Sequence, residues 1–315
     1  MLLHVLHETA YDYVPMVRTA QHVAHLKPVD SAHQELLSHR LTIAPGPARA
    51  AEQPDVFGNV RSFFSLQFPH DFLRVQADSL VRTTACKEPS HDLPWEQVAD
   101  RLRYHRGARY DPAAGFAFAS PYVPRDGEFV EYAQASFAAG RPLLAAAHDL
   151  MRRIHEDFEY ETTATDVNTP ALEALALRKG VCQDLAHVML GCLRSLGLPA
   201  RYVSGYLLTE PAPGQPRLVG CDASHAWVAV YLPAADDAPG TWVELDPTND
   251  RTAGEDYVTL AIGRDFSDVS PMRGVIHGGT HHSLRVAVTV TPSEPTSAAP
   301  AMPESAPAIS SRSQP

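Results

Sequence analysis

The sequence predicts an α+β protein in which an antiparallel, β-sandwich-like domain precedes a mixed core of helices and strands. Three observations support this fold class. Short runs of strand-like composition fill about the first 85 residues, apolar residues at helical spacing follow from about residue 92, and strand-like runs return after residue 200. A chain of 315 residues is long enough to bury a sizeable core and suggests two domains.

The first domain is expected to span residues 1–88 and to contain short antiparallel strands. Its strand-like runs cover residues 1–9, 38–44, 60–68 and 72–83. In the last of these runs Leu73, Val75 and Ala77 alternate with polar neighbours, as in a strand with one buried face. The segment from Asp55 to Asn59 is a turn signal just before the third run. Short strands separated by turns favour a sandwich.

The second domain, residues 89–290, is expected to begin with helices and to end with strands. The expected helices begin near Asp92, Asp126, Arg141, Thr169 and Cys182. The last of them ends at Leu196, because Gly197 and Pro199 form a stop signal. The expected strands cover residues 200–209, 225–232, 241–246 and 284–290. Residues 291–315 are rich in Pro, Ser and Ala and are expected to form a disordered tail.

Composition restricts the class of protein. A formal net charge of -11 argues against sequence-independent binding to nucleic acid or to an anionic membrane. The first 13 residues read as a strand and not as a signal peptide, and no apolar run approaches the roughly 18 residues that span a bilayer, so we expect a cytoplasmic protein. The four cysteines are too few for a disulfide framework and are expected to be free thiols. They are Cys86, Cys182, Cys192 and Cys221.

Cys182 is the candidate nucleophile. It lies in the first turn of its expected helix, where unpaired backbone N–H groups and the helix dipole favour a thiolate. Gly180 allows a sharp turn that leaves the sulfur accessible. The N–H of Cys182 can donate to an oxyanion that forms on attack at this sulfur.

His225 and Asp246 are the candidate base and orienting acid. If the two strands that carry them form a hairpin, pairing Tyr231 with Gly240 places His225 opposite Asp246. Opposed side chains in such a ladder have Cβ atoms about 5 Å apart. The carboxylate can then accept a hydrogen bond from the imidazole and favour imidazolium.

These residues lie in segments that closely resemble the bacterial transglutaminase-like family of the papain-like thiol superfamily. The segments are 180–187, 197–206, 224–227 and 243–248, with 7–11, 55–59 and 263–268 similar to the flanking regions of the family. The resemblance covers the chain to about residue 290. It implies a papain-like core with Cys182 as nucleophile, His225 as general base and Asp246 as orienting acid. No cofactor or metal is expected.

The implied chemistry is thiol-dependent acyl transfer at an amide bond, through a thioester. We favour hydrolysis of a peptide, protein or small amide, since no calcium signature of cross-linking enzymes is visible. Two alternatives remain open: a protein-glutamine transglutaminase and a non-catalytic peptide-binding module. The oligomeric state is also open.

Other polar residues near Cys182 have plainer interpretations. His187 is expected to be a structural hydrogen-bonding residue, because positions five apart on a helix point about 140° apart. Asp184 is expected to interact with the helix dipole, and Cys192 to be a core residue. Zinc binding through pairs such as Cys221 and His225 is disfavoured by their spacing. Tyr160 and Gln183 are candidates for a second oxyanion donor.

Overall fold

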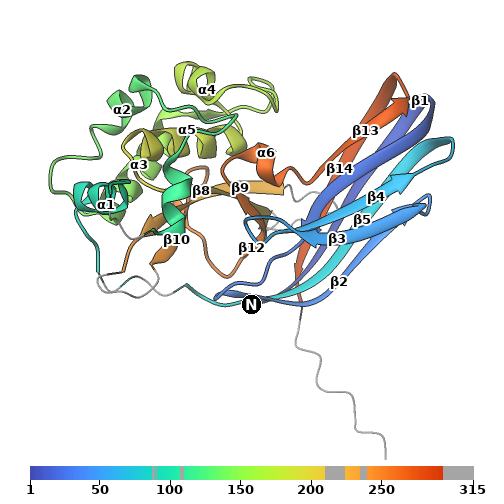
Figure 1. Cartoon of the computed structure of the whole chain (residues 1–315), viewed down its shortest axis with the longest axis horizontal. Helices are drawn as coiled ribbons and strands as arrows, with labels where there is room; N and C mark the ends of the chain where they lie inside the picture. Colours follow the sequence, from blue (N-terminus) through green and yellow to red (C-terminus); the bar gives the residue numbers. More distant parts are fainter. Residues whose placement is uncertain (87–88, 90, 107–109, 210–223, 235–239, 294–315) are drawn as a thin grey trace, which may run out of the picture.

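The computed structural model describes residues 1–86, 89, 91–106, 110–209, 224–234 and 240–293. Figure 1 shows an elongated sheet on one side of the molecule and a group of helices on the other, with the strands of a second sheet between them. The α+β fold class with an N-terminal antiparallel sheet is confirmed. Each helix in these ranges is too short or too polar to cross a membrane.

The N-terminal strands form one connected seven-stranded antiparallel sheet. The strands are β1 (Leu2–Lys27), β2 (Gln34–Ala44), β3 (Arg49–Pro54), β4 (Val60–Leu66), β5 (His70–Thr83), β13 (Met272–Gly278) and β14 (His281–Pro292). With 26 residues, β1 is long enough to pair with β5 and β14 along its first half and with β4 and β13 along its second. One strand therefore joins both halves of the sheet.

The expected boundaries at the C-terminal end are wrong. We expected residues up to 290 to belong to the second domain, but β13 and β14 both pair with β1 in the first sheet. The tail was expected to begin at residue 291, yet Leu3 still pairs with Pro292. The reason is that the alternating residues of β14 bury Val288 and Val290 in the core of the N-terminal sheet. The rest of the expected tail, residues 294–315, lies outside the described ranges.

The core of the second domain is a five-stranded antiparallel sheet covered by helices. Its strand order is β11 (Arg251–Thr252), β10 (Thr241–Asp246), β9 (Ser224–Leu232), β8 (Ala200–Leu207) and β12 (Tyr257–Gly263). The helices are α1 (Trp95–Leu102), α2 (Gly127–Ala133), α3 (Leu143–Asp157), α4 (Ala171–Leu177), α5 (Cys182–Ser195) and α6 (Phe266–Val269), with a 3-10 turn at Pro112–Ala117. A parallel pair, β6 (Glu159–Tyr160) and β7 (Lys179–Gly180), precedes α5.

Helix α5 is the central helix of this domain. Every residue from Asp184 to Arg194 is buried, because apolar side chains surround α5 on nearly all sides. Its apolar residues pack in one cluster with α2, α3, α4 and the inner face of strands β8 and β9. A helix held on all sides fixes the position of its first turn, where Cys182 lies.

The two domains meet at β12, the edge strand of the second sheet. Tyr206, Val258 and Leu260 pack into the apolar core of the N-terminal sheet, beside Leu3 and Val5. Burial of such apolar surface is the main stabilising contribution at this junction.

Two side-chain amides of the N-terminal domain pair with the exposed backbone of β12. Gln34 accepts from the N–H of Thr259 and donates to its carbonyl, both at 2.7 Å. Asn59 accepts from the N–H of Ile262 at 2.8 Å and donates to its carbonyl at 2.7 Å. The amides thus take the place of a sixth strand and satisfy an otherwise unpaired edge.

Replacing Asn59 with alanine is expected to lower the free energy of unfolding by about 2–4 kcal/mol, because the N–H and C=O of Ile262 lose their partners in a buried interface. Thermal and denaturant melts measure this change. Gln53→Ala, on the exposed edge strand β3, is the control and should change stability by less than about 0.5 kcal/mol. Equal effects of the two substitutions would contradict the role of Asn59.

Candidate active site

Cys182 is the first residue of α5, as the sequence predicts. The chain reaches it through β7, where Gly180 pairs with Tyr160 of β6. Asp184 reaches back over this turn, and its Oδ2 accepts the N–H of Val181 at 2.8 Å. A Cβ on Gly180 would lie 2.5 Å from this oxygen, and its φ of 155° also favours glycine. The glycine therefore permits the cap that fixes the half-buried cysteine.

His225 and Asp246 are in direct contact. The imidazole Nε2 lies 2.7 Å from Oδ2 of Asp246. The strand register that we expected is wrong, however: Tyr231 pairs with Trp242 and not with Gly240. This shift of two residues makes His225 a diagonal and not a direct neighbour of Asp246. Diagonal neighbours lie on the same face, so the longer side chains still meet.

Asp246 is fully buried and accepts several hydrogen bonds. Besides the imidazole, Oδ2 accepts the hydroxyl of Tyr257 and the side-chain amide of Asn249, both at 2.7 Å. Oδ1 accepts the N–H of Thr248 at 2.9 Å. Burial by itself would raise the pKa of Asp246, but the bonds from His225, Asn249 and Tyr257 outweigh it and lower the pKa. The carboxylate is therefore ionised at neutral pH.

The imidazole of His225 connects Asp246 with Cys182. Burial lowers the pKa of His225, but the hydrogen bonds and negative charges of Asp246 and Cys182 outweigh it and raise the pKa to about 10. Since Nε2 faces Asp246, Nδ1 is the nitrogen available to the cysteine sulfur. The side chains of Cys182, His225 and Asp246 thus lie in one hydrogen-bonded series, in the order that thiol chemistry requires.

Aromatic rings enclose the imidazole. Trp227 stacks on His225 with ring centroids 6.0 Å apart, and Tyr257 packs edge-on against Trp227 at 5.2 Å. The indole N–H of Trp227 donates to Glu244 at 2.8 Å. These contacts restrict the rotation of His225 and exclude water from the side of the ring that faces the core.

The two candidates for a second oxyanion donor differ in position. The amide of Gln183 donates to the carbonyl of Val167 at 3.0 Å, so it tethers a neighbouring loop. Tyr160 is 56% exposed, and its pKa is raised by partial burial and by the negative charge of Cys182. Because Tyr160 pairs with Gly180, two residues before Cys182, it is the better placed of the two.

The other residues near Cys182 have structural roles. His187 is fully buried between Tyr122 and Tyr202, accepts the N–H of Phe266 at 3.2 Å, and has a pKa that burial lowers to about 3. Cys192 is a buried core residue, and Cys86 is exposed. Cys221, and with it the Cys221–His225 zinc hypothesis, lies outside the described residues.

Two residues of the site were not found from the sequence. Asn249 follows Asp246 by three residues, and the Asp-Pro-Thr-Asn turn was a possible signal, since such turns fold side chains back on the Asp. Tyr257 begins an edge strand eleven residues after Asp246, and no spacing rule predicts their contact. No cluster of three potential metal-ligating side chains occurs in the part of the chain that the structure describes.

Family models match segments in both domains of the chain. The model of the transglutaminase-like superfamily matches residues 130–247, and that of the bacterial transglutaminase-like N-terminal region matches residues 3–82. An uncharacterized protein of Mycobacterium tuberculosis is 37% identical over 300 residues, covering 92% of both chains. A protein-glutamine gamma-glutamyltransferase of Pseudomonas aeruginosa is 31% identical over 128 residues, which are 40% of this chain and 18% of that enzyme.

A solved structure shares the fold over nearly the whole chain. The crystal structure of a protein from Cytophaga hutchinsonii, described as a candidate cysteine protease, superposes with a TM-score of 0.69. The match covers 94% of this chain and 92% of that one at 19% identity. It supports the arrangement of the N-terminal sheet and the papain-like core.

Proposed function

The chain belongs to the bacterial transglutaminase-like family, and we propose that it is a thiol-dependent enzyme that cleaves amide bonds by acyl transfer. The proposed nucleophile is Cys182, the acid and base is His225, and Asp246 orients the imidazole. One observation carries the proposal: the imidazole that contacts Cys182 is held at 2.7 Å by a buried carboxylate. A buried carboxylate–imidazole contact stabilises a thiolate–imidazolium pair. If its role were only to fill space, apolar residues would do so at a lower cost in desolvation free energy.

The reaction begins with attack of the Cys182 thiolate on the amide carbonyl carbon. A C–S bond forms, and the resulting oxyanion is stabilised by the N–H of Cys182 and by the hydroxyl of Tyr160. The C–N bond then breaks, and His225 gives its proton to the departing amine. Water adds to the thioester, His225 accepts a proton from it, and a carboxylic acid leaves as the thiolate forms again.

Hydrolysis is the outcome that we favour over transfer to an amine. Cys182 is partly exposed, and the neighbouring Tyr160 is 56% exposed, so water reaches the thioester. Transfer to an amine requires that water be kept away from this intermediate. The proposed substrates are peptides, proteins or small amides in the cytoplasm. Incorporation of a labelled amine that exceeds hydrolysis would contradict this preference.

The decisive test is the pH dependence of alkylation by iodoacetamide at each cysteine, followed by peptide mass spectrometry. At pH 6 we expect Cys182 to react at least about 10-fold faster than the exposed Cys86, because the neighbouring His225 imidazolium activates its sulfur. His225→Ala should remove this difference.

His4→Ala, at a half-exposed position in the N-terminal sheet, is the matched control and should leave the difference unchanged. If Cys182 reacts no faster than Cys86 in the unmodified protein, the proposed thiolate–imidazolium pair is wrong. The non-catalytic peptide-binding module would then be favoured.

A further inference from the structure

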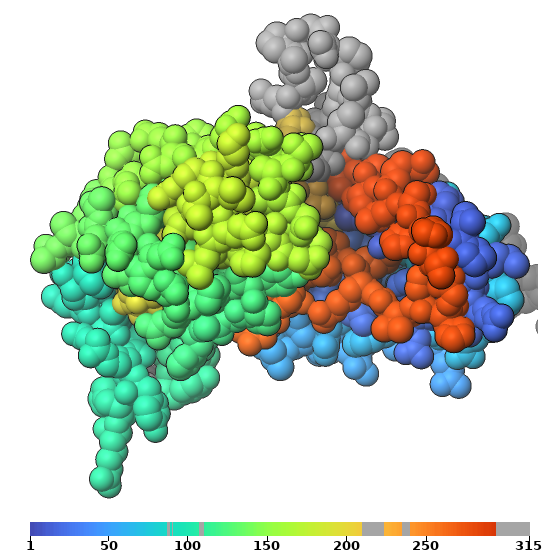
Figure 2. Space-filling view, turned by 90° about the horizontal axis from the view of Figure 1, so that it is seen from above, coloured from blue at the N-terminus to red at the C-terminus, as the bar shows by residue number. Residues whose placement is uncertain are grey.

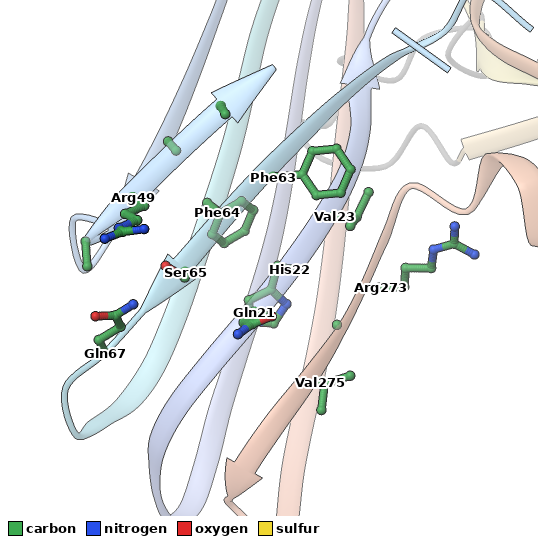
Figure 3. Close-up of a pocket in the computed structure, with 14 residues that line it drawn as sticks. Gln21, His22, Val23, Arg49, Phe63, Phe64, Ser65, Gln67, Arg273 and Val275 are labelled. Atoms are coloured by element: carbon green, nitrogen blue, oxygen red, sulfur yellow. The ribbon is translucent and has the colours of Figure 1, made fainter. Parts of the chain in front are cut away.

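Two of the surface hollows among the described residues differ in character. The larger, about 1010 Å³, is lined by strands β1, β4 and β13 and by residues in and around β3, all in the N-terminal sheet (Figure 3). The smaller, about 520 Å³, lies between the domains. We call it the interdomain groove; Tyr11, Leu284 and Val286 line one side, and Tyr122, Val167 and Phe266 the other. In Figure 2 the orange-red strands β13 and β14 lie next to the yellow-green helices of the second domain.

One wall of the interdomain groove continues the established domain interface. Leu3 and Val5 of β1 pack against the second domain, and the same face of the strand continues through His7, Thr9 and Tyr11. Thr9 pairs with Val286, and Tyr11 with Leu284. Here the sheet extends past the second domain, so Leu284 is 54% exposed and Val286 47% exposed. Within the described ranges of the chain, this part of the wall is thus apolar and only partly covered.

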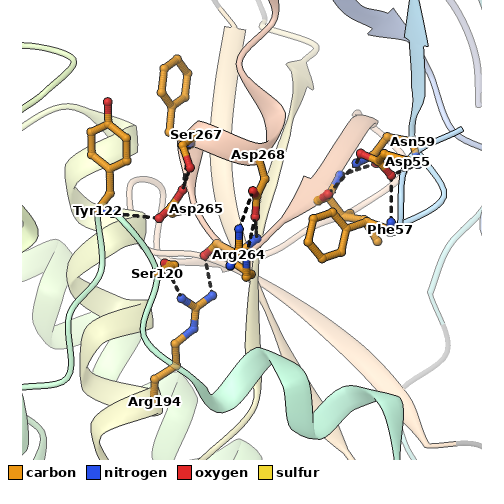
Figure 4. A network of polar contacts seen from close by, with 12 residues as sticks. Asp55, Phe57, Asn59, Ser120, Tyr122, Arg194, Arg264, Asp265, Ser267 and Asp268 are labelled. Atoms are coloured by element: carbon orange, nitrogen blue, oxygen red, sulfur yellow. Dashed lines mark hydrogen bonds and ion pairs between the residues drawn. The ribbon is translucent and has the colours of Figure 1, made fainter. Parts of the chain in front are cut away.

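The opposite wall is rigid. Buried Asp265 accepts the N–H of Tyr122 at 2.8 Å and that of Ser267 at 2.9 Å, which fixes the start of α6 to the loop before α2 (Figure 4). Arg264 forms a two-point ion pair with Asp268 at 2.8 and 3.0 Å in the same network. Because these contacts hold Tyr122 and Phe266 in place, the groove is formed before any ligand arrives.

Two lining residues of the interdomain groove lie close in the chain or by a hydrogen bond to the two halves of the candidate active site. Its lining residue Ser224 directly precedes His225. Its lining residue Val167 accepts a hydrogen bond from Gln183, which directly follows Cys182. The groove therefore adjoins the segments that carry the proposed base and the proposed nucleophile.

The charge of the lining restricts the occupant. Among the residues that the structure describes, Arg273 is the only charged one that lines the groove, and no carboxylate of these residues lines it. The lining residue His7 is neutral at pH 7, because burial lowers its pKa to about 4. A segment with lysine or arginine would be repelled by Arg273 and would lose hydration without a partner. An apolar segment matches the exposed leucine and valine.

We propose that the interdomain groove is the acyl-donor subsite and that it binds an extended, apolar peptide segment without basic side chains. This inference rests on the proposed function for its link to catalysis. Leu284 and Val286 then determine specificity, and the N-terminal sheet supplies one wall of the substrate site. The domain that carries no catalytic residue would thus select the substrate.

Two peptide chloromethyl ketones test the proposal, acetyl-Ala-Leu-Leu and acetyl-Ala-Lys-Lys, with iodoacetamide as a small reference reagent. In each case the Cys182 sulfur bonds to the methylene carbon and the halide leaves. We expect the leucine probe to label Cys182 at least about 10-fold faster than the lysine probe. Val286→Asp should slow the leucine probe about 10-fold and change the iodoacetamide rate less than about 2-fold.

Val275→Asp is the matched control, because it places the same carboxylate on an exposed strand valine that lines the larger hollow instead. It should leave the leucine probe unaffected. Equal labelling by the two probes, or no effect of Val286→Asp on the leucine probe, would overturn the groove assignment even if iodoacetamide shows a reactive thiolate.

A binding measurement separates the groove from the thiol chemistry. Fluorescence anisotropy with a fluorescein-labelled Ala-Leu-Leu amide and the Cys182→Ala variant needs no reactive sulfur. Adding Val286→Asp to that variant should weaken binding about 10-fold, and adding Val275→Asp should not. This result would support the groove even if alkylation disproved the proposed function; unchanged binding with Val286→Asp would reject the groove.

Discussion

Replacing Cys182 with alanine is expected to lower kcat/KM for amide hydrolysis by at least about 10⁴-fold, to the background rate. The thioester cannot form without the sulfur, and the remaining site can only position water. Alanine suits the first turn of a helix, and Cys182 is only partly buried, so the free energy of unfolding should change by less than about 1 kcal/mol. Steady-state kinetics and a thermal melt on the same preparation measure both quantities.

The matched control for this substitution is Cys86→Ala, which removes an exposed thiol outside the candidate site. Its kcat/KM should equal that of the unmodified enzyme. If Cys182→Ala retains turnover within about 10-fold of the unmodified protein, the hydrolysis does not proceed through this thiol. The assignment of Cys182 as nucleophile would then have to be abandoned.

Replacing Asp246 with asparagine is expected to reduce kcat by about 10²–10⁴-fold, because the imidazolium loses its counter-charge and its tautomer is no longer fixed. The neutral amide also meets the hydroxyl of Tyr257 and the amide of Asn249, which both donate to the carboxylate. At least one donor must reorient or lose its partner, so the variant should also be less stable.

The Asp246→Asn substitution should also shift the pH dependence of the reaction rate, and the pKa of His225 predicts the direction of that shift. In the unmodified protein the pKa of His225 is raised to about 10, so its imidazolium persists to high pH and the alkaline limb of the rate profile lies near pH 10. Without the Asp246 carboxylate this pKa falls, and the alkaline limb should move to lower pH. The raised pKa of His225 also contributes to the free energy of unfolding. This contribution is full below pH 6.5 and is lost as pH rises through about 10.

Glu244→Gln is the control for Asp246→Asn, since Glu244 lies on the same strand and accepts the indole N–H of Trp227. Its pH–rate profile should keep the alkaline limb of the unmodified protein. If the alkaline limb of the pH–rate profile moves equally in both variants, the pKa of His225 is set by the general negative charge and not by the contact with Asp246.

The sequence was most informative where one local rule decides the structure. The stop signal after Leu196 and the apolar residues of α5 predict the helix, so Cys182 lies at its first turn as expected. The contact between His225 and Asp246 was also predicted, although from a register that is wrong by two residues. The predicted contact is nevertheless correct, because a register shift of two residues keeps both side chains on the same face of the sheet.

Contacts between distant segments could not be predicted in this way. The pairing of β1 with β14 joins strands from opposite ends of the described chain, and no local pattern encodes it. Tyr257 meets Asp246 because β12 pairs with β8, while the N-terminal amides Gln34 and Asn59 bind the other edge of β12. Such contacts result from tertiary packing and leave no periodicity in the sequence.

The pairing of Leu3 with Pro292 has a consequence for biosynthesis. At the ordinary ribosomal rate of about 5–20 residues per second, β14 emerges roughly 15–60 s after β1. During that interval one side of β1 has backbone N–H and C=O groups without a strand partner, next to other nascent chains on the same polysome. Such an edge readily adds foreign strands. Slow translation would therefore favour aggregation of this protein, and a chaperone that covers β1 until residue 292 emerges would raise the yield of folded enzyme.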